Sequence, residues 1–86
     1  MKTIMMLFAR YEGQPQIPLD RVREDFFGGM TREVFKKKVE SGEVPLPLIR
    51  LGKGQKAALM IALQDLADYL DRCADEARRE LVRKLG

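Results

Sequence analysis

The side chains with the clearest chemical potential are basic, and they gather in the middle third of the chain. Residues 31–56 carry seven lysines and arginines against three acidic residues, a net charge of +4, whereas residues 1–30 have four of each and residues 57–86 have five against six. A basic surface of this kind binds polyanions such as the phosphates of nucleic acid. A solvated helix face without a partner would show the same enrichment, so charge alone leaves both interpretations open.

Catalytic and metal-binding groups are scarce by comparison. The chain has no histidine and a single cysteine, Cys73, so a zinc site lacks ligands and a nucleophilic thiol lacks a base. Asp65 and Asp68 begin a predicted helix, where carboxylates stabilise the helix dipole. We therefore predict no enzyme activity, no cofactor and no metal. Cys73 falls on an apolar helix stripe and is predicted to be a small buried hydrophobic residue.

The length and the hydropathy pattern set the size and the environment of the protein. Eighty-six residues suffice for one domain, 1–86, with one modest core. No apolar run approaches the ~20 residues that span a bilayer, and a lone cysteine suits a reducing compartment. We therefore expect a cytoplasmic protein that does not contact a membrane.

Two short helices are predicted in the first third. The first has helical spacing of Ile4, Leu7, Phe8 and Tyr11, with Gly13 as a C-terminal cap. Met5 and Met6 would suit a strand equally well. The second helix follows Ile17-Pro18, carries the apolar stripe Leu19, Val22 and Phe26, and ends at Gly28-Gly29.

The third predicted helix, Thr31 to Gly42, contains the three consecutive lysines of "TREVFKKKVESG". Thr31 is a suitable N-cap and Gly42 a suitable stop. The apolar face is predicted to hold Val34, Phe35 and Val39, with Lys38 beside it. The opposite face is predicted to hold Arg32, Glu33, Lys36, Lys37 and Glu40.

A β-hairpin is predicted next, because the apolar runs "LIRL" and "ALMIAL" flank the segment from Gly52 to Lys56. Lys53 and Lys56 fall at its tip. Period-two alternation puts Ile49, Leu51, Leu59, Ile61 and Leu63 on one side and Arg50 on the other.

One long amphipathic helix is predicted from Gln64 to Leu85. Its apolar stripe contains Leu66, Leu70, Cys73 or Ala74, Ala77 and Leu81. At 1.5 Å per residue such a helix is about 33 Å long, which exceeds what a small core can cover. The uncovered stripe is expected to pair with a second copy and form a homodimer, or to fold back against the first helix.

This order of elements predicts a mainly α protein with a small β-hairpin, a winged helix-turn-helix with a long C-terminal helix. The third helix would enter the major groove of double-stranded DNA, and the hairpin would contact phosphates. Arg32 is the best candidate to read a base, because its guanidinium can bond two acceptors of guanine. The full set of predicted DNA-binding residues is Thr31, Arg32, Lys36, Lys37, Arg50, Lys53 and Lys56.

Several segments also resemble the pyocin activator protein family, small bacterial regulators that switch on bacteriocin genes. The resemblance is carried by "MLFARYEG", "IPLDRVREDFF", "VFKKKVESGEVPLPLIRL", "QKAA" and "DLADYLD". It reaches Asp71, and it is broadly similar in plan to the winged helices of phage excisionases and MerR-type regulators. The resemblance implies transcriptional activation of prophage or bacteriocin genes through promoter DNA in the bacterial cytoplasm, with RNA polymerase as a possible further partner.

Two alternatives remain open at this point. An excisionase-like protein would bend DNA instead of recruiting the transcription machinery. A small protein-interaction adaptor would use the last helix to bind a partner and would not bind DNA.

Overall fold

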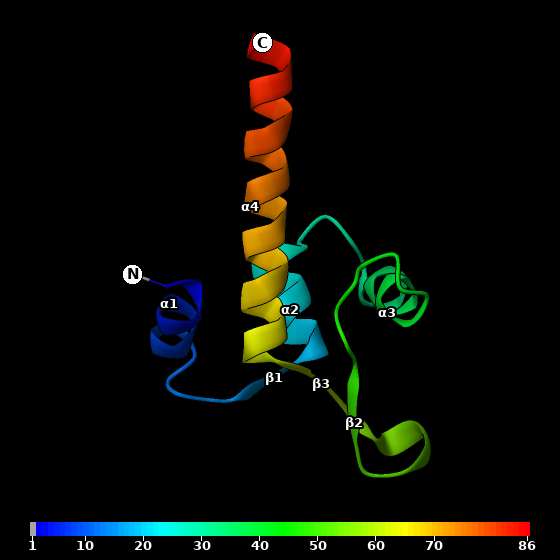
Figure 1. The fold of residues 1–86 in the computed structure, drawn as a ribbon. Helices are drawn as coiled ribbons and strands as arrows, with labels where there is room; N and C mark the ends of the chain where they lie inside the picture. The colour runs from blue at the N-terminus through cyan, green and yellow to red at the C-terminus, as the bar shows by residue number, and fades with distance from the viewer. Residues whose placement is uncertain (1) are drawn as a thin grey trace.

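The computed structural model describes residues 2–86, which fold into helices packed around a small sheet (Figure 1). The fold is mainly helical with a long C-terminal helix, as predicted, and is compatible with a winged helix-turn-helix. The elements in chain order are α1 (Thr3–Arg10), β1 (Gln16–Pro18), α2 (Leu19–Phe26), α3 (Arg32–Glu40), β2 (Ile49–Leu51), the 3-10 helix η1 (Gly54–Lys56), β3 (Ala58–Ala62) and α4 (Leu63–Leu85).

The first segment is a helix, so the alternative that Met5 and Met6 belong to a strand is wrong. Leu7 and Tyr11 are buried on its inner face, while both methionines are exposed. Gly13 follows with φ +77°, and its N–H donates to the carbonyl of Phe8 at 2.8 Å. This left-handed glycine closes the helix end as the sequence predicted.

The sheet has three antiparallel strands in the order β1-β3-β2. The sequence analysis missed β1, because three residues are too few to show an alternating pattern. Ile17 of β1 pairs with Ile61 of β3, and both side chains are buried. Pro18 is tolerated because β1 is an edge strand.

The hairpin forms where predicted, but the predicted faces are wrong. Arg50 pairs directly with Leu59, and Ile49 pairs with Met60. Directly paired residues point to the same face, so Arg50 shares the face of Leu59 and Ile61, whereas Ile49 lies on the other one. The length of the loop sets this register, and a shift of one residue reverses every side chain.

The core joins α2, α3 and the first half of α4. Phe35 is fully buried, and its ring lies 4.6 Å from that of Phe27, which in turn lies 5.9 Å from that of Tyr69. Val39 is buried as predicted, but Val34 is 43% exposed, so its predicted place in the apolar face is wrong. Only one narrow side of the short helix α3 meets the core.

The long helix α4 is covered only along its first half (Figure 1). Thr3 of α1 donates from Oγ1 to Asp71 Oδ1 at 2.5 Å, and Leu66 is fully buried. The first helix thus covers the beginning of the stripe, in part as the fold-back alternative expected. Beyond Asp71 the helix projects from the body, and Cys73 is exposed. The prediction that Cys73 is buried is therefore wrong.

The free half of α4 retains an uncovered apolar end. Leu81, Val82 and Leu85 are 55%, 68% and 78% exposed. Within residues 2–86, no helix is both long enough and apolar enough to cross a membrane.

Candidate nucleic-acid interface

Helix α3 begins with a capped turn that fixes its N-terminal residues. The N–H of Val34 donates to Thr31 Oγ1 at 3.3 Å, and Glu33 lies in the first turn, at the positive end of the helix dipole. Arg32 and Lys37 are exposed, whereas Lys36 is half-buried. The helix therefore presents two exposed cations, while the hydroxyl of Thr31 is already engaged as the cap.

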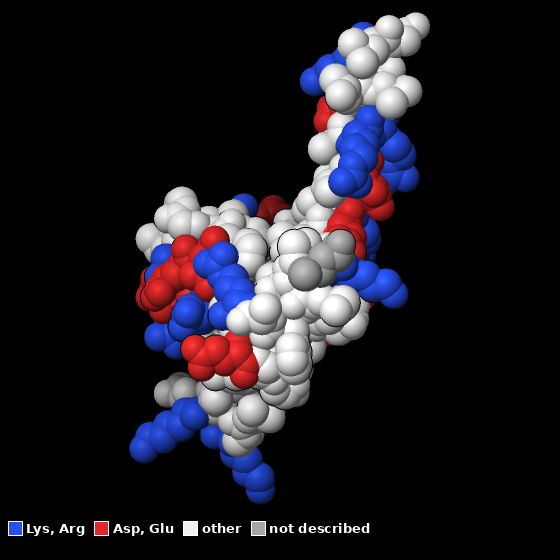
Figure 2. Space-filling model, turned by 90° about the vertical axis from the view of Figure 1, so that its left-hand side faces the viewer, with Lys and Arg blue, Asp and Glu red and all other residues white. Residues whose placement is uncertain are grey.

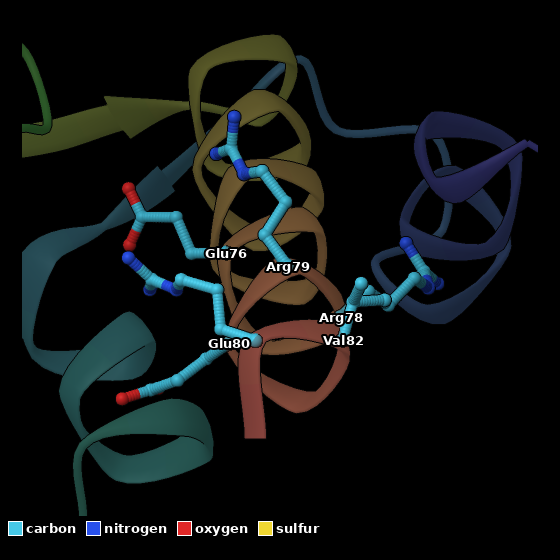
Figure 3. A pocket seen from close by; sticks show the side chains of 6 residues that line it. Glu76, Arg78, Arg79, Glu80 and Val82 are labelled. Carbon is cyan, nitrogen blue, oxygen red and sulfur yellow. The ribbon is translucent and has the colours of Figure 1, made fainter. Parts of the chain in front are cut away.

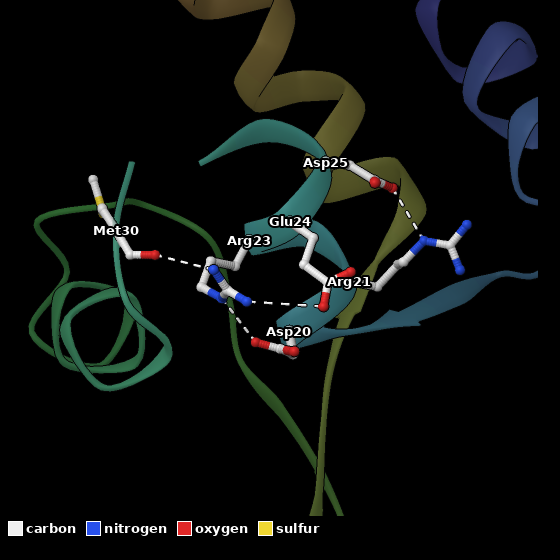
Figure 4. A network of polar contacts seen from close by, with 6 residues as sticks. All are labelled: Asp20, Arg21, Arg23, Glu24, Asp25 and Met30. Carbon is white, nitrogen blue, oxygen red and sulfur yellow. Dashed lines mark hydrogen bonds and ion pairs between the residues drawn. The ribbon is translucent and has the colours of Figure 1, made fainter. Parts of the chain in front are cut away.

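The turn before α3 is held by an arginine that the sequence analysis did not single out (Figure 4). Arg23 donates from Nε to Asp20 Oδ1 at 2.8 Å and from Nη1 to the carbonyl of Met30 at 3.1 Å. This hydrogen bond from Arg23 lowers the pKa of Asp20. Because Met30 directly precedes the N-cap, Arg23 positions the start of α3 relative to α2. The signal in the sequence was the i,i+3 spacing of Asp20 and Arg23.

The hairpin formed by β2, residues 52–57 and β3 occupies the place of the wing in a winged helix-turn-helix, and we call it the wing. Its loop contains Lys53 and Lys56, both exposed. Figure 2 shows basic side chains projecting from the lower end of the molecule, where Figure 1 places this loop. Gly52 and Gly54 have φ values of +103° and +69°, which side chains rarely adopt. The glycines thus let the loop turn sharply and present its lysines.

Arg50 connects the wing to α3. Its Nη2 lies 2.8 Å from Glu40 Oε2, near the end of α3. Both side chains are partly exposed, so the pair contributes little to overall stability. It nevertheless couples the two elements that would face DNA. The predicted phosphate contact of Arg50 stays a prediction, and it would have to share the guanidinium with Glu40.

Lys36 faces the shallow cleft between α3 and the wing. The cleft is lined by Lys36, Arg50, Gly54, Gln55, Ala57 and Leu59. Two of these side chains are cationic, and none is acidic, although Glu40 pairs with Arg50 at 2.8 Å. Lys36 and Lys37 therefore differ in their surroundings, because Lys37 is exposed on α3 and does not line the cleft. The structure brings Lys36 and Arg50 together, whereas Lys38 turns away and pairs with Glu43 at 2.6 Å.

A second hollow lies beside the free half of α4, but the side chains that line it do not point toward a common centre. Its lining residues are Glu76, Arg78, Arg79, Glu80, Val82 and Arg83. Figure 3 shows the labelled side chains pointing to different sides of one helix. A ligand pocket needs polar groups aimed at a common point. Among residues 2–86, no three potential metal ligands lie together either.

Comparison with known proteins agrees with the resemblance noted in the sequence. Residues 3–77 match the family described as pyocin activator protein PrtN. The match covers α1 to β3 in full and ends within the free half of α4. No curated protein and no solved structure shows significant similarity. Because the match spans most of the chain, the chain belongs to the pyocin activator protein PrtN family.

Proposed function

We propose that this protein is a sequence-specific DNA-binding transcriptional activator of bacteriocin or prophage genes in the bacterial cytoplasm. One observation carries the proposal: exposed cations occupy the two elements that a winged helix-turn-helix applies to DNA. Arg32 and Lys37 are exposed on α3, and Lys53 and Lys56 are exposed on the wing. The family described as an activator supports the regulatory role.

In this proposal α3 enters the major groove, and the wing contacts the sugar-phosphate backbone. Contacts to phosphate position a protein without reading sequence, whereas base edges supply specificity. Lys53 and Lys56 then supply affinity for any duplex. Arg32, in the first turn of α3, lies where recognition helices reach base edges. The Arg50–Glu40 pair links the wing to the end of the helix.

A gel-shift titration at increasing salt tests the proposal against the adaptor alternative. The probe is a pool of random-sequence duplexes, from which bound molecules are recovered and amplified. A DNA-binding protein retains duplexes at low salt, enriches a sequence over successive rounds, and loses affinity steeply with salt because bound counterions are released. Failure to retain any duplex at low salt would favour the adaptor.

A matched pair of variants tests which surface is used. Replacing Lys53 and Lys56 by alanine removes two charges from the wing. Replacing Arg72 and Arg79 by alanine removes the same charge from exposed positions on the side of α4 opposite Leu81. We expect the first double variant to bind all duplexes more weakly and the second to keep the wild-type affinity. A bend assay on the selected duplex then separates simple recognition from the excisionase-like alternative, which requires a strongly bent complex.

We further propose that a second copy of the chain covers the free end of α4. In an antiparallel pairing centred on Leu81, Leu85 of each copy faces Ala77 of the other, as helical spacing requires. Lys84 of each copy then approaches Glu80 of the other. The exposed leucines support this arrangement because their burial is favourable. A two-fold dimer would read half-sites one DNA turn apart or a multiple of it.

A further inference from the structure

Val34 is an apolar side chain in a helix face that is otherwise charged. It is 43% exposed, whereas the other apolar residues of α3, Phe35 and Val39, are buried. Lys37, one turn further along the same face, is exposed. Valine is a poorer helix former than alanine or lysine, so an exposed valine gains nothing for the isolated helix. Single exposed hydrophobic residues are common, and the position of Val34 is what distinguishes it.

The backbone of Val34 is anchored in the first turn of α3. Its N–H is the group that the Thr31 hydroxyl caps, at 3.3 Å. The first turn of a recognition helix is the part that contacts base edges. In addition, a β-branched side chain in a helix has essentially one χ1 rotamer. The two methyl groups of Val34 are therefore held in one place before any DNA arrives, and their contact would cost little side-chain entropy.

The major groove offers one apolar group to such a side chain. Among the four bases only thymine carries a methyl group at its groove edge, and apolar side chains contact it. We infer that Val34 is a specificity-determining residue that contacts the C5-methyl group of a thymine in the target site. The inference rests on the proposed DNA binding through α3. It assigns to one helix two kinds of readout, hydrogen bonding through Arg32 and apolar contact through Val34.

Replacing thymine by uracil tests this directly, because the change removes only the methyl group. The probe is the duplex recovered from the random pool, with each thymine replaced in turn. We expect wild-type affinity to fall about fourfold at one position, the value for one buried methyl-sized group. Val34→Ala should bind the thymine and uracil duplexes equally at that position. Met5→Ala is the matched control, because Met5 is 57% exposed on α1, outside the proposed DNA-binding elements, and it should keep the fourfold preference.

The outcomes separate this inference from the proposed function. Retention of the selected duplex by the wild type, with no thymine position sensitive to uracil, would overturn the role of Val34 and leave DNA binding intact. A Val34→Ala protein that still prefers thymine at the sensitive position would also overturn it. If the wild type retains no duplex, the proposed function itself fails. The circular dichroism of Val34→Ala should match that of the wild type, since the side chain lies outside the core.

Discussion

The hydroxyl of Tyr11 joins α1 to α2, and its removal should destabilise the protein by a predictable amount. Tyr11 is 4% exposed, and its Oη donates to Asp25 Oδ2 at 2.5 Å. Arg21 lies 3.2 Å from the same carboxylate oxygen, and Arg10 lies 3.5 Å from the other. Tyr11→Phe leaves both arginines in place, so the carboxylate remains compensated. We expect a loss near the low end of the range for hydrogen bonds to charged groups, about 1.5 kcal/mol.

The pH dependence gives a second prediction from the same contact. Burial, together with the hydrogen bond to Asp25, raises the pKa of Tyr11 to about 12, from 10.0. A raised pKa means that the stability due to the neutral phenol is fully present below pH 10 and is lost as the pH rises towards 12. At pH 11, one unit above the ordinary pKa, the free energy of unfolding has fallen by about 1.4 kcal/mol. The wild type and Tyr11→Phe should therefore become almost equally stable at pH 11, and their order should reverse towards pH 12.

Urea unfolding at pH 8 and pH 11, followed by circular dichroism, measures both effects. Tyr69→Phe is the control, because it removes the other tyrosine hydroxyl of the chain, which is hydrogen-bonded to Cys73 and not to a carboxylate. This control also leaves Tyr11 as the sole tyrosine, so its phenolate absorbance titrates Tyr11 alone, with an expected midpoint near 12. A stability gap between wild type and Tyr11→Phe that stays the same from pH 8 to pH 11 would refute the burial of the Tyr11 hydroxyl and its hydrogen bond to Asp25, the two causes of its raised pKa.

Three further predictions concern DNA and self-association. Replacing Lys53 and Lys56 by alanine should reduce the log–log salt slope by about 1.8, because each lost phosphate contact removes about 0.9, and an unchanged slope in gel shifts would exclude the wing from the interface. Arg32→Ala should cost about 1–3 kcal/mol on the selected duplex and little on a scrambled one; an equal loss on both would assign Arg32 to phosphates. Sedimentation should find the wild type dimeric at micromolar concentration and Leu81→Asp monomeric, and a monomeric wild type would refute pairing through α4.

Local chemistry made much of the fold predictable. Thr31 and Gly42 define the limits of α3 because capping and left-handed turns depend on single residue types. The glycines at 52 and 54 likewise predicted the hairpin. The strand β1 was not predictable in the same way. Its three residues acquire a strand conformation only because β3 lies beside them, and that neighbour is more than forty residues away in sequence.

The errors in the predicted faces have one physical cause. Helical and strand periodicity define angles between side chains, but the covering elements decide which angles are buried. Val34 lies about 100° from Phe35 around α3, and the core does not extend that far. Cys73 continues the apolar stripe of α4, but α1 and α2 cover only the first half of that helix. Arg50 lies on the face opposite to the predicted one, because the length of the loop, and not the strand pattern, sets Leu59 as its partner.

The sequence predicted the candidate site as a set of seven residues. The structure divides this set into residues that already make contacts within the protein and residues that do not. Thr31 caps α3, Arg50 pairs with Glu40, and Lys36 lies half-buried beside the wing. Tertiary contacts of this kind cannot be read from spacing. The remaining four, Arg32, Lys37, Lys53 and Lys56, are exposed and form no ion pair within residues 2–86.

Because Arg32 is assigned to a base, the other three cations set the scale of the electrostatic contribution to binding. At about 0.9 per phosphate, one protomer can generate a salt slope of about −2.7, and two protomers on one site about −5.4. The salt slope of the selected duplex therefore counts the chains on the DNA, independently of sedimentation. A slope of about −2.7 with first-power dependence on protein concentration would mean that one wing and one helix suffice. A slope of about −5.4 with second-power dependence would mean that the free end of α4 brings two interfaces to one site.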